Sequence, residues 1–156
     1  MSERMNELNA FAAAHGLTVK GTPTLHEFEL TGASTGRTVT MAQGSILQPR
    51  GAGKMFHFRL TFEPFVCEPS WMMTPQGSTK WSHSSPSPCA PEDVPGFARF
   101  GPPLTEFGAE VKTHWQLKLG EMNRLYLEAL ELVSPRAWDL AWKVLEEVWN
   151  ASKPAR

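Results

Sequence analysis

Hydrophobic positions along the chain first follow a helical period. In residues 2–15, apolar side chains recur every three or four positions and so gather on one side of a helix. Ser2 is suited to cap the beginning of this helix. Gly16 is suited to end it, because glycine readily adopts the left-handed conformation that closes many helices. The pattern therefore predicts a helix over residues 2–15.

The period then changes to two. Apolar and polar residues alternate through LHEFELTG (25–32), RTVTMA (37–42) and KMFHFRLTFE (54–63). Such alternation buries one face of a strand and leaves the other in water. The link GASTG between the first two runs is typical of a hairpin turn, and Pro64 ends the third run. We therefore expect a three-stranded antiparallel meander whose outer face is polar.

A long proline-rich segment covers residues 68–104. It holds eight of the thirteen prolines, together with aromatic and methionine side chains that water solvates poorly. Because proline interrupts helices and strands, the composition predicts one long loop. Its apolar residues favour packing on the domain, and loops of this length often carry function.

Two further changes of period complete the chain. GAEVKTHWQLKLG (108–120) has five alternating apolar and polar pairs and predicts a half-buried strand. Residues 122–133 return to a spacing of three or four and predict a core-facing helix. Ser134 and Pro135 then suit the cap and first position of a last helix. The whole order predicts a single α+β domain: an antiparallel sheet of about four strands, with an N-terminal helix and a C-terminal helical pair (121–151) packed on one face.

Composition and charge narrow the class of protein. The 156 residues are 41% hydrophobic and include six Trp and nine Phe, which suits a packed core without disulfide staples. The formal net charge of -1 lacks the basic excess of a dedicated nucleic-acid binder and the acidic excess of a nucleic-acid mimic. No apolar stretch is long enough for a membrane span, and no signal peptide is apparent. We expect a soluble cytoplasmic protein with no cofactor and no membrane contact.

Two motif-like patterns fail on their spacing. QPRGAGKM (48–55) lacks the first glycine and the final Ser or Thr of a phosphate-binding loop, and it precedes a strand rather than a helix. His57, Cys67, His83 and Cys89 lack the short spacing between ligands that is typical of structural zinc. The sequence therefore predicts neither a phosphate loop nor a metal site, and it leaves open whether the two cysteines pair.

Tryptophan is frequent, and its positions suggest a contact surface. Trp138, Trp142 and Trp149 share one stripe of the last predicted helix, while Trp71 and Trp81 lie in the proline-rich segment. A tryptophan stripe is usually core packing, but the preceding predicted helix already supplies an apolar face for the sheet. Large aromatic residues are enriched in protein interfaces. We therefore predict a non-enzymatic module that binds another protein, or a second copy of itself, through these five residues.

The sequence leaves the particular role of such a module open. Small proteins that act by surface complementarity include inhibitors, adaptors and assembly factors. We expect an inhibitor of a host defence protein, carried by a phage or mobile element. A phage virion or assembly subunit, for which oligomer formation is the function, is an alternative.

A second alternative is a small ribonuclease-like enzyme. His57 and Arg59 lie on the polar face of the third predicted strand, and Lys112 and His114 lie on that of the next. One histidine would act as base, the other as acid, and the cations would stabilise the developing phosphorane charge. This chemistry needs the two strands to be adjacent and in register.

Overall fold

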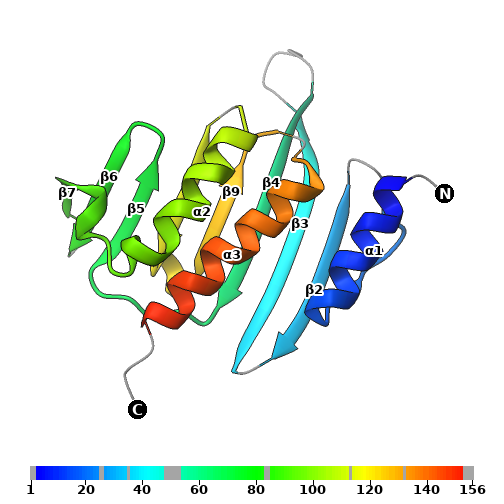
Figure 1. The fold of residues 1–156 in the computed structure, drawn as a ribbon, viewed down its shortest axis with the longest axis horizontal. Coiled ribbons are helices and arrows are strands. Elements are labelled where there is room, and N and C mark those ends of the chain that lie inside the picture. The colour runs from blue at the N-terminus through cyan, green and yellow to red at the C-terminus, as the bar shows by residue number, and fades with distance from the viewer. Residues whose placement is uncertain are drawn as a thin grey trace.

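The computed structural model describes residues 3–24, 27–34, 36–47, 54–82, 85–112, 114–131 and 133–152. Within these ranges the chain forms one nine-stranded sheet, and its three α-helices lie together on one face of that sheet (Figure 1). The helices are α1 (Glu3–His15), α2 (Phe97–Glu110) and α3 (Pro135–Ser152). The strands are β1 (Thr18–Val19), β2 (Phe28–Ser34), β3 (Arg37–Leu47), β4 (Lys54–Glu63), β5 (Ser70–Thr74), β6 (Gly77–Ser82), β7 (Ser85–Cys89), β8 (Trp115–Leu119) and β9 (Leu125–Ala129). The architecture is α+β in two layers.

All neighbouring strands are antiparallel, in the order β1-β2-β3-β4-β9-β8-β5-β6-β7. The first four strands neighbour one another in chain order, as the alternating pattern predicts for β2 to β4. Strand β9, the last in the chain, lies between β4 and β8. It therefore joins the N-terminal strands to a second group formed by β5 to β8.

Several local predictions are confirmed. Helix α1 ends at His15, and Gly16 follows with a φ of +67°, the left-handed conformation expected of a helix-ending glycine. Strand β4 spans the whole of KMFHFRLTFE. Helix α3 begins at Pro135, and Ser134 Oγ accepts a hydrogen bond of 3.2 Å from the backbone N–H of Ala137. The proposed cap at Ser2 and most of QPRGAGKM lie outside the described residues.

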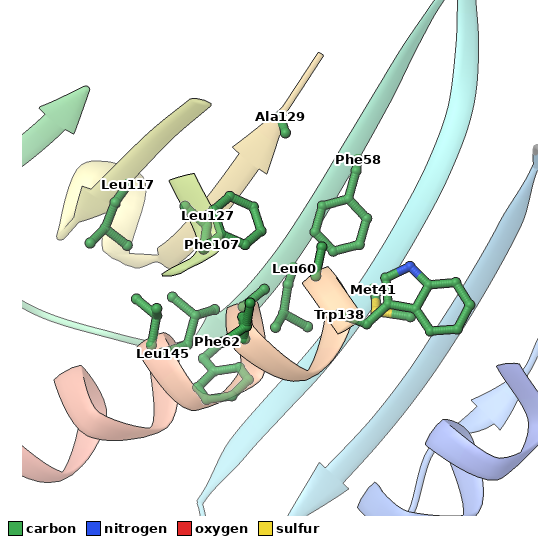
Figure 2. Close-up of a cluster of buried hydrophobic side chains, with 14 of the residues drawn as sticks. Met41, Phe58, Leu60, Phe62, Phe107, Leu117, Leu127, Ala129, Trp138 and Leu145 are labelled. Carbon is green, nitrogen blue, oxygen red and sulfur yellow. The ribbon is translucent and has the colours of Figure 1, made fainter. Parts of the chain in front are cut away.

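The core lies between the helices and the middle of the sheet. Figure 2 shows Trp138 and Leu145 of α3 among side chains from the central strands, including Leu60 of β4 and Leu127 of β9. Leu60, Leu127 and Leu145 have no exposed surface, and Trp138 is 2% exposed. Apolar and polar residues alternate strictly in β4, so its apolar side chains share one face, which packs against α3. Arg59 and the polar residues at every second position lie on the opposite face.

A buried arginine ties β3 to α3. Arg37 is 7% exposed, and its Nη2 lies 2.7 Å from Glu146 Oε2. Its guanidinium carbon also lies 4.1 Å from the centre of the Phe62 ring. Because a buried charge needs both a partner and a favourable surrounding, the carboxylate and the aromatic ring together make this burial tolerable.

The prediction of a four-stranded sheet with a long loop is wrong. The proline-rich segment forms β5, β6 and β7 and most of α2. Pro86 and Pro88 lie in β7, the strand at the edge of the sheet. No further strand pairs with the outer side of β7, so a missing N–H on that side breaks no hydrogen bond of the sheet. The segment therefore extends the sheet, and its prolines mark the strand at the edge.

Helix α2 forms although it contains Pro102 and Pro103. Its buried residues include Phe100, Leu104 and Phe107. Burying each of these side chains contributes about 1.5–3 kcal/mol. The three together are comparable in size with the loss of about 3 kcal/mol that each of the two internal prolines brings to a helix. Tertiary packing thus stabilises this helix although its prolines disfavour helical structure.

Two predictions near the C-terminus are also wrong. Gly108 belongs to α2, and the strand predicted over residues 108–120 begins only at Trp115. Residues 125–129 form strand β9 rather than part of a helix. Four of the five residues of β9 are buried, because the strand has neighbours on both sides and a helix layer above it. A short apolar run of this kind fits a buried strand and a helix equally well, and only the sheet decides.

Candidate functional site

The sheet face opposite the helices carries a row of side chains in register. Directly paired residues on neighbouring strands project to the same side of a sheet. Thr61 of β4, Tyr126 of β9, Lys118 of β8 and Met72 of β5 are paired in this order. Each follows or precedes buried residues that face the helices, so the row lies on the uncovered face.

A carboxylate joins two of the predicted site residues on this face. Glu128 of β9 pairs with Arg59 of β4 across the strands. Its Oε2 accepts hydrogen bonds from Arg59 Nη2 at 2.9 Å and Nε at 3.1 Å. The same oxygen lies 2.8 Å from His57 Nε2. The structure thus brings His57, Arg59 and Glu128 together.

These contacts control the ionisation of Glu128, whose side chain is 15% exposed. Burial by itself would raise the pKa of its carboxyl group. The hydrogen bonds from His57 and Arg59, and the positive charge of Arg59, outweigh burial and lower the pKa of Glu128 from 4.5 to about 2. Glu128 is therefore a carboxylate throughout the neutral range.

A second polar cluster continues along the same face. The Arg59 guanidinium lies 4.6 Å from the centre of the Tyr126 ring, and Lys118 Nζ lies 5.6 Å from it. The Tyr126 hydroxyl donates a hydrogen bond of 2.7 Å to Glu121 Oε2, and Lys118 Nζ lies 3.0 Å from the same oxygen. The hydrogen bond from Tyr126 and the charge of Lys118 lower the pKa of Glu121, against the effect of burial. Lys118 and Glu121 form a satisfied pair.

This pair lies at the wall of a groove, which we call the Trp81 groove. The groove has a volume of about 710 Å³, within the range of ligand sites. It lies where β5 begins, β6 ends and β8 turns towards β9. Its lining residues are Glu68, Pro69, Ser70, Trp71, Met72, Trp81, Ser82, Lys118, Gly120, Glu121 and Met122. Trp81 and Met72 stand on the uncovered face because Trp81 pairs with Ser70, and Met72 with Lys118.

Met122 presents its side chain to solvent at the rim of this groove. It is 75% exposed, and its φ of +54° is in the left-handed region that non-glycine residues rarely adopt. Such a conformation costs on the order of 1–3 kcal/mol, and strain of this size is common at functional sites. A strained turn that exposes a methionine is consistent with a contact surface.

The five predicted partner-binding tryptophans occupy two different places. Trp138 is 2% exposed and lies in the core, and Trp142 and Trp149 are partly buried and pack against that core. Trp71 and Trp81 both line the groove, but Trp71 is partly buried, packs against the core and pairs with the buried Leu119, whereas Trp81 is 38% exposed. Of the five, Trp81 is therefore the one that the structure exposes at the groove.

Strand β9 separates the two strands that the enzyme hypothesis requires to be adjacent. Trp115 of β8 and Phe58 of β4 both pair with Ala129, so His114 and His57 hold equivalent positions two strands apart. At about 4.8 Å per strand, their backbones lie about 10 Å apart. Lys112 is exposed in the segment between α2 and β8, and its backbone N–H donates to Glu131.

The sequence pattern did not identify Glu121, Tyr126 and Glu128 as site residues. Tyr126 and Glu128 lie within the helix predicted over residues 122–133, and Glu121 lies directly before it, so their relation to β4 and β8 could not be seen. The signal that could have found two of them is the alternation of Leu125, Leu127 and Ala129, which leaves Tyr126 and Glu128 on the opposite face.

Both cysteines are free thiols. Cys67 donates a hydrogen bond to the carbonyl oxygen of Pro69 at 3.3 Å, and burial raises the pKa of its thiol. Cys89 lies in the edge strand β7. Within the described ranges, the histidines, cysteines and acids form no group of three that could hold a metal ion, and His83 lies outside those ranges.

The described helices include none that is long and apolar enough to cross a membrane.

Comparison with models of protein families, with curated protein sequences and with solved structures found no match to this chain. The class defined by the fold and the site is therefore an α+β protein with one uncovered sheet face and a groove at its end.

Proposed function

We propose that the protein is a non-enzymatic protein-binding module whose contact surface is the Trp81 groove. The observation that carries this proposal is where large apolar side chains are exposed. In the described part of the chain these are Val66, Trp81 and Met122. Two of these three, Trp81 and Met122, line the groove, and Val66 does not. Most of the exposed large apolar side chains therefore lie at the groove.

The residue types suit protein recognition. Tryptophan is among the residues that contribute most to binding energy when buried at the centre of an interface. Methionine adapts its shape to a partner, and both Met72 and Met122 line the groove. Lys118 and Glu121 at the wall satisfy each other, so a partner can cover them without leaving an unpaired charge.

Within this class we favour an inhibitor of a host defence protein, encoded by a phage or mobile element. Such a protein needs a complementary surface and no reaction chemistry. The alternative form of binding module is an assembly subunit. It would use the same surface to bind copies of itself or another structural protein.

The test is purification of the tagged protein from its native host, followed by identification of proteins that copurify in stoichiometric amount. The partner is then purified, and the Kd is measured for wild type, Trp81→Ala and Val66→Ala. Because removal of a central tryptophan typically costs about 2 kcal/mol or more, Trp81→Ala should raise the Kd about 30-fold. Val66 does not line the groove, so Val66→Ala should change the Kd less than about threefold.

The outcomes separate the candidates. A stoichiometric partner whose Kd is the same for wild type and Trp81→Ala contradicts the groove as the contact surface. Light scattering that shows a defined oligomer, lost in Trp81→Ala, supports the assembly subunit. A monomer that copurifies with nucleic acid and no protein contradicts the binding module.

A second candidate function rests on the His57–Glu128–Arg59 cluster. A carboxylate 2.8 Å from a histidine nitrogen fixes the orientation of the ring, as in many general acid–base sites. Arg59 would stabilise negative charge on a phosphate, and His114 faces the same side two strands away. The two strands are not adjacent as the sequence hypothesis required, so on this hypothesis the phosphodiester lies over β9, and His57 and His114 act as base and acid across the distance of about 10 Å between their backbones.

This candidate is tested by incubating the purified protein with end-labelled single-stranded and double-stranded RNA. Cleavage that His57→Ala and His114→Ala each reduce at least about 100-fold, with Trp81→Ala as the unaffected control, supports the enzyme. Cleavage that survives both histidine substitutions indicates a contaminating nuclease and contradicts this candidate.

A further inference from the structure

The edge of the sheet next to the groove is closed to pairing through the main chain. In β7, Pro86 pairs with Trp81 and Pro88 with Thr79. Proline has no N–H, and prolines are tolerated in an edge strand at positions whose N–H side faces away from the neighbouring strand. A further strand added to this edge would find two donors missing. A partner at this end of the molecule must therefore be held by side chains.

The charges in the groove do not cancel. Glu68, Lys118 and Glu121 are the charged residues of its lining. Lys118 and Glu121 neutralise each other at 3.0 Å. Glu68 is exposed and forms neither an ion pair nor a hydrogen bond with the described residues. The groove thus presents one uncompensated negative charge beside its apolar surface.

The aromatic rings of the groove favour the same sign of ligand. The face of an indole ring attracts cations. Lys80 already uses this attraction within the chain, because its Nζ lies 5.9 Å from the centre of the Trp71 ring. Trp81 is the exposed tryptophan of the groove, and among the described residues no cation of this chain lies over its ring.

From these observations we infer that the occupant of the Trp81 groove is a short segment of a partner protein that carries Arg or Lys next to an apolar residue. The apolar side chain packs against Met72, Met122 and Trp81. The cation lies between Glu68 and the Trp81 ring, where a guanidinium can form an ion pair and stack at the same time. This inference rests on the proposed function and adds the chemistry of the partner.

The experiment selects random short peptides, displayed on phage, against the purified full-length protein. Peptides that also bind the Trp81→Ala variant are removed. We expect the remaining peptides to be enriched in Arg or Lys adjacent to an apolar residue. For the strongest peptide, Glu68→Gln should raise the Kd about tenfold, and this loss should shrink at high salt. The matched control is Glu92→Gln, which neutralises an exposed carboxylate outside the groove and should leave the Kd unchanged.

A charge exchange makes the inference independent of folding effects. Glu68 is exposed and unpaired, so Glu68→Lys should retain the thermal stability of the wild type. The same selection against Glu68→Lys should now enrich Asp or Glu at the position of the former cation. If residue 68 had only a structural role, its charge would not change the charge of the selected peptides.

The inference and the proposed function fail in different ways. Peptides that depend on Trp81 but lack a basic residue, and that bind Glu68→Gln as well as wild type, overturn the basic segment and leave the binding module in place. Selection that yields no Trp81-dependent peptide also overturns the inference. The proposed function fails on separate measurements: either the host partner binds Trp81→Ala as tightly as wild type, or the protein copurifies with nucleic acid and no protein partner.

Discussion

The ionised carboxylate of Glu128 should make the stability of the protein depend on pH in a defined direction. Its pKa is about 2 in the folded protein against 4.5 for an ordinary glutamate. A folded-state pKa that is lowered means that ionisation stabilises the fold. The contribution is therefore fully present above about pH 4.5 and is lost as the pH falls towards 2.

The size of this contribution follows from the same values. At about 1.4 kcal/mol for each pKa unit, the difference corresponds to about 3 kcal/mol. Arg59 is 37% exposed, so water screens part of its interaction with Glu128. We therefore expect a net contribution of about 2 kcal/mol at neutral pH.

The perturbation is Glu128→Gln, which keeps the shape of the side chain and one acceptor oxygen but removes the charge. Urea unfolding, followed by tryptophan fluorescence, is measured for both proteins between pH 7 and pH 2.5. The variant should be less stable by about 2 kcal/mol at pH 7. This difference should decrease steadily below pH 4.5 and approach zero near pH 2.

The control is Glu106→Gln, because the carboxylate of Glu106 lies 3.8 Å from Arg136 in a pair whose side chains are both more than half exposed. Its loss should cost less than about 0.5 kcal/mol. A difference between wild type and Glu128→Gln that stays constant down to pH 2.5, or grows on acidification, would refute a lowered pKa at Glu128.

Two further predictions concern packing and backbone conformation, and urea unfolding at pH 7 checks both. Trp138 is 2% exposed and Trp81 is 38% exposed. Trp138→Ala should therefore lower the free energy of unfolding by about 3–5 kcal/mol, and Trp81→Ala by about 1 kcal/mol. Equal losses would contradict the assignment of Trp138 to the core and Trp81 to the surface. At Gly120, with a φ of +95°, an added Cβ would lie 2.6 Å from the carbonyl oxygen of Cys67. Gly120→Ala should therefore destabilise by more than about 1 kcal/mol. Gly44→Ala should instead stabilise slightly, by about 0.5 kcal/mol, because its Cβ would meet no atom within 4 Å; a loss at Gly44 as large as that at Gly120 would contradict this reasoning.

The candidate site was only half visible in the sequence. His57 and Arg59 could be placed on a polar strand face, because strict alternation in β4 fixes which residues face the core. The contact of Glu128 with both could not be predicted, since its relation to Arg59 exists only once β9 pairs with β4. The groove likewise depends on the pairing of β5 with β6 and β8, which places Trp81 opposite Ser70 and Lys118 opposite Met72.

The sequence by itself determined those elements whose burial is one-sided. Helix α1, the meander from β2 to β4, and helix α3 each have one apolar and one polar face, and a single period then identifies the element. Local chemistry also set two of their ends, at Gly16 and at Ser134.

Tertiary structure alone decided the elements whose local signals conflict. Strand β9 is buried on several sides, so its apolar residues do not distinguish a period of two from one of 3.6. Helix α2 overcomes two internal prolines because three large side chains are buried on it. Strands β5 to β7 form because β8 offers an edge to pair with, and their prolines are tolerated at the outermost position. In each case the deciding free energy comes from partners distant in sequence, which no local pattern contains.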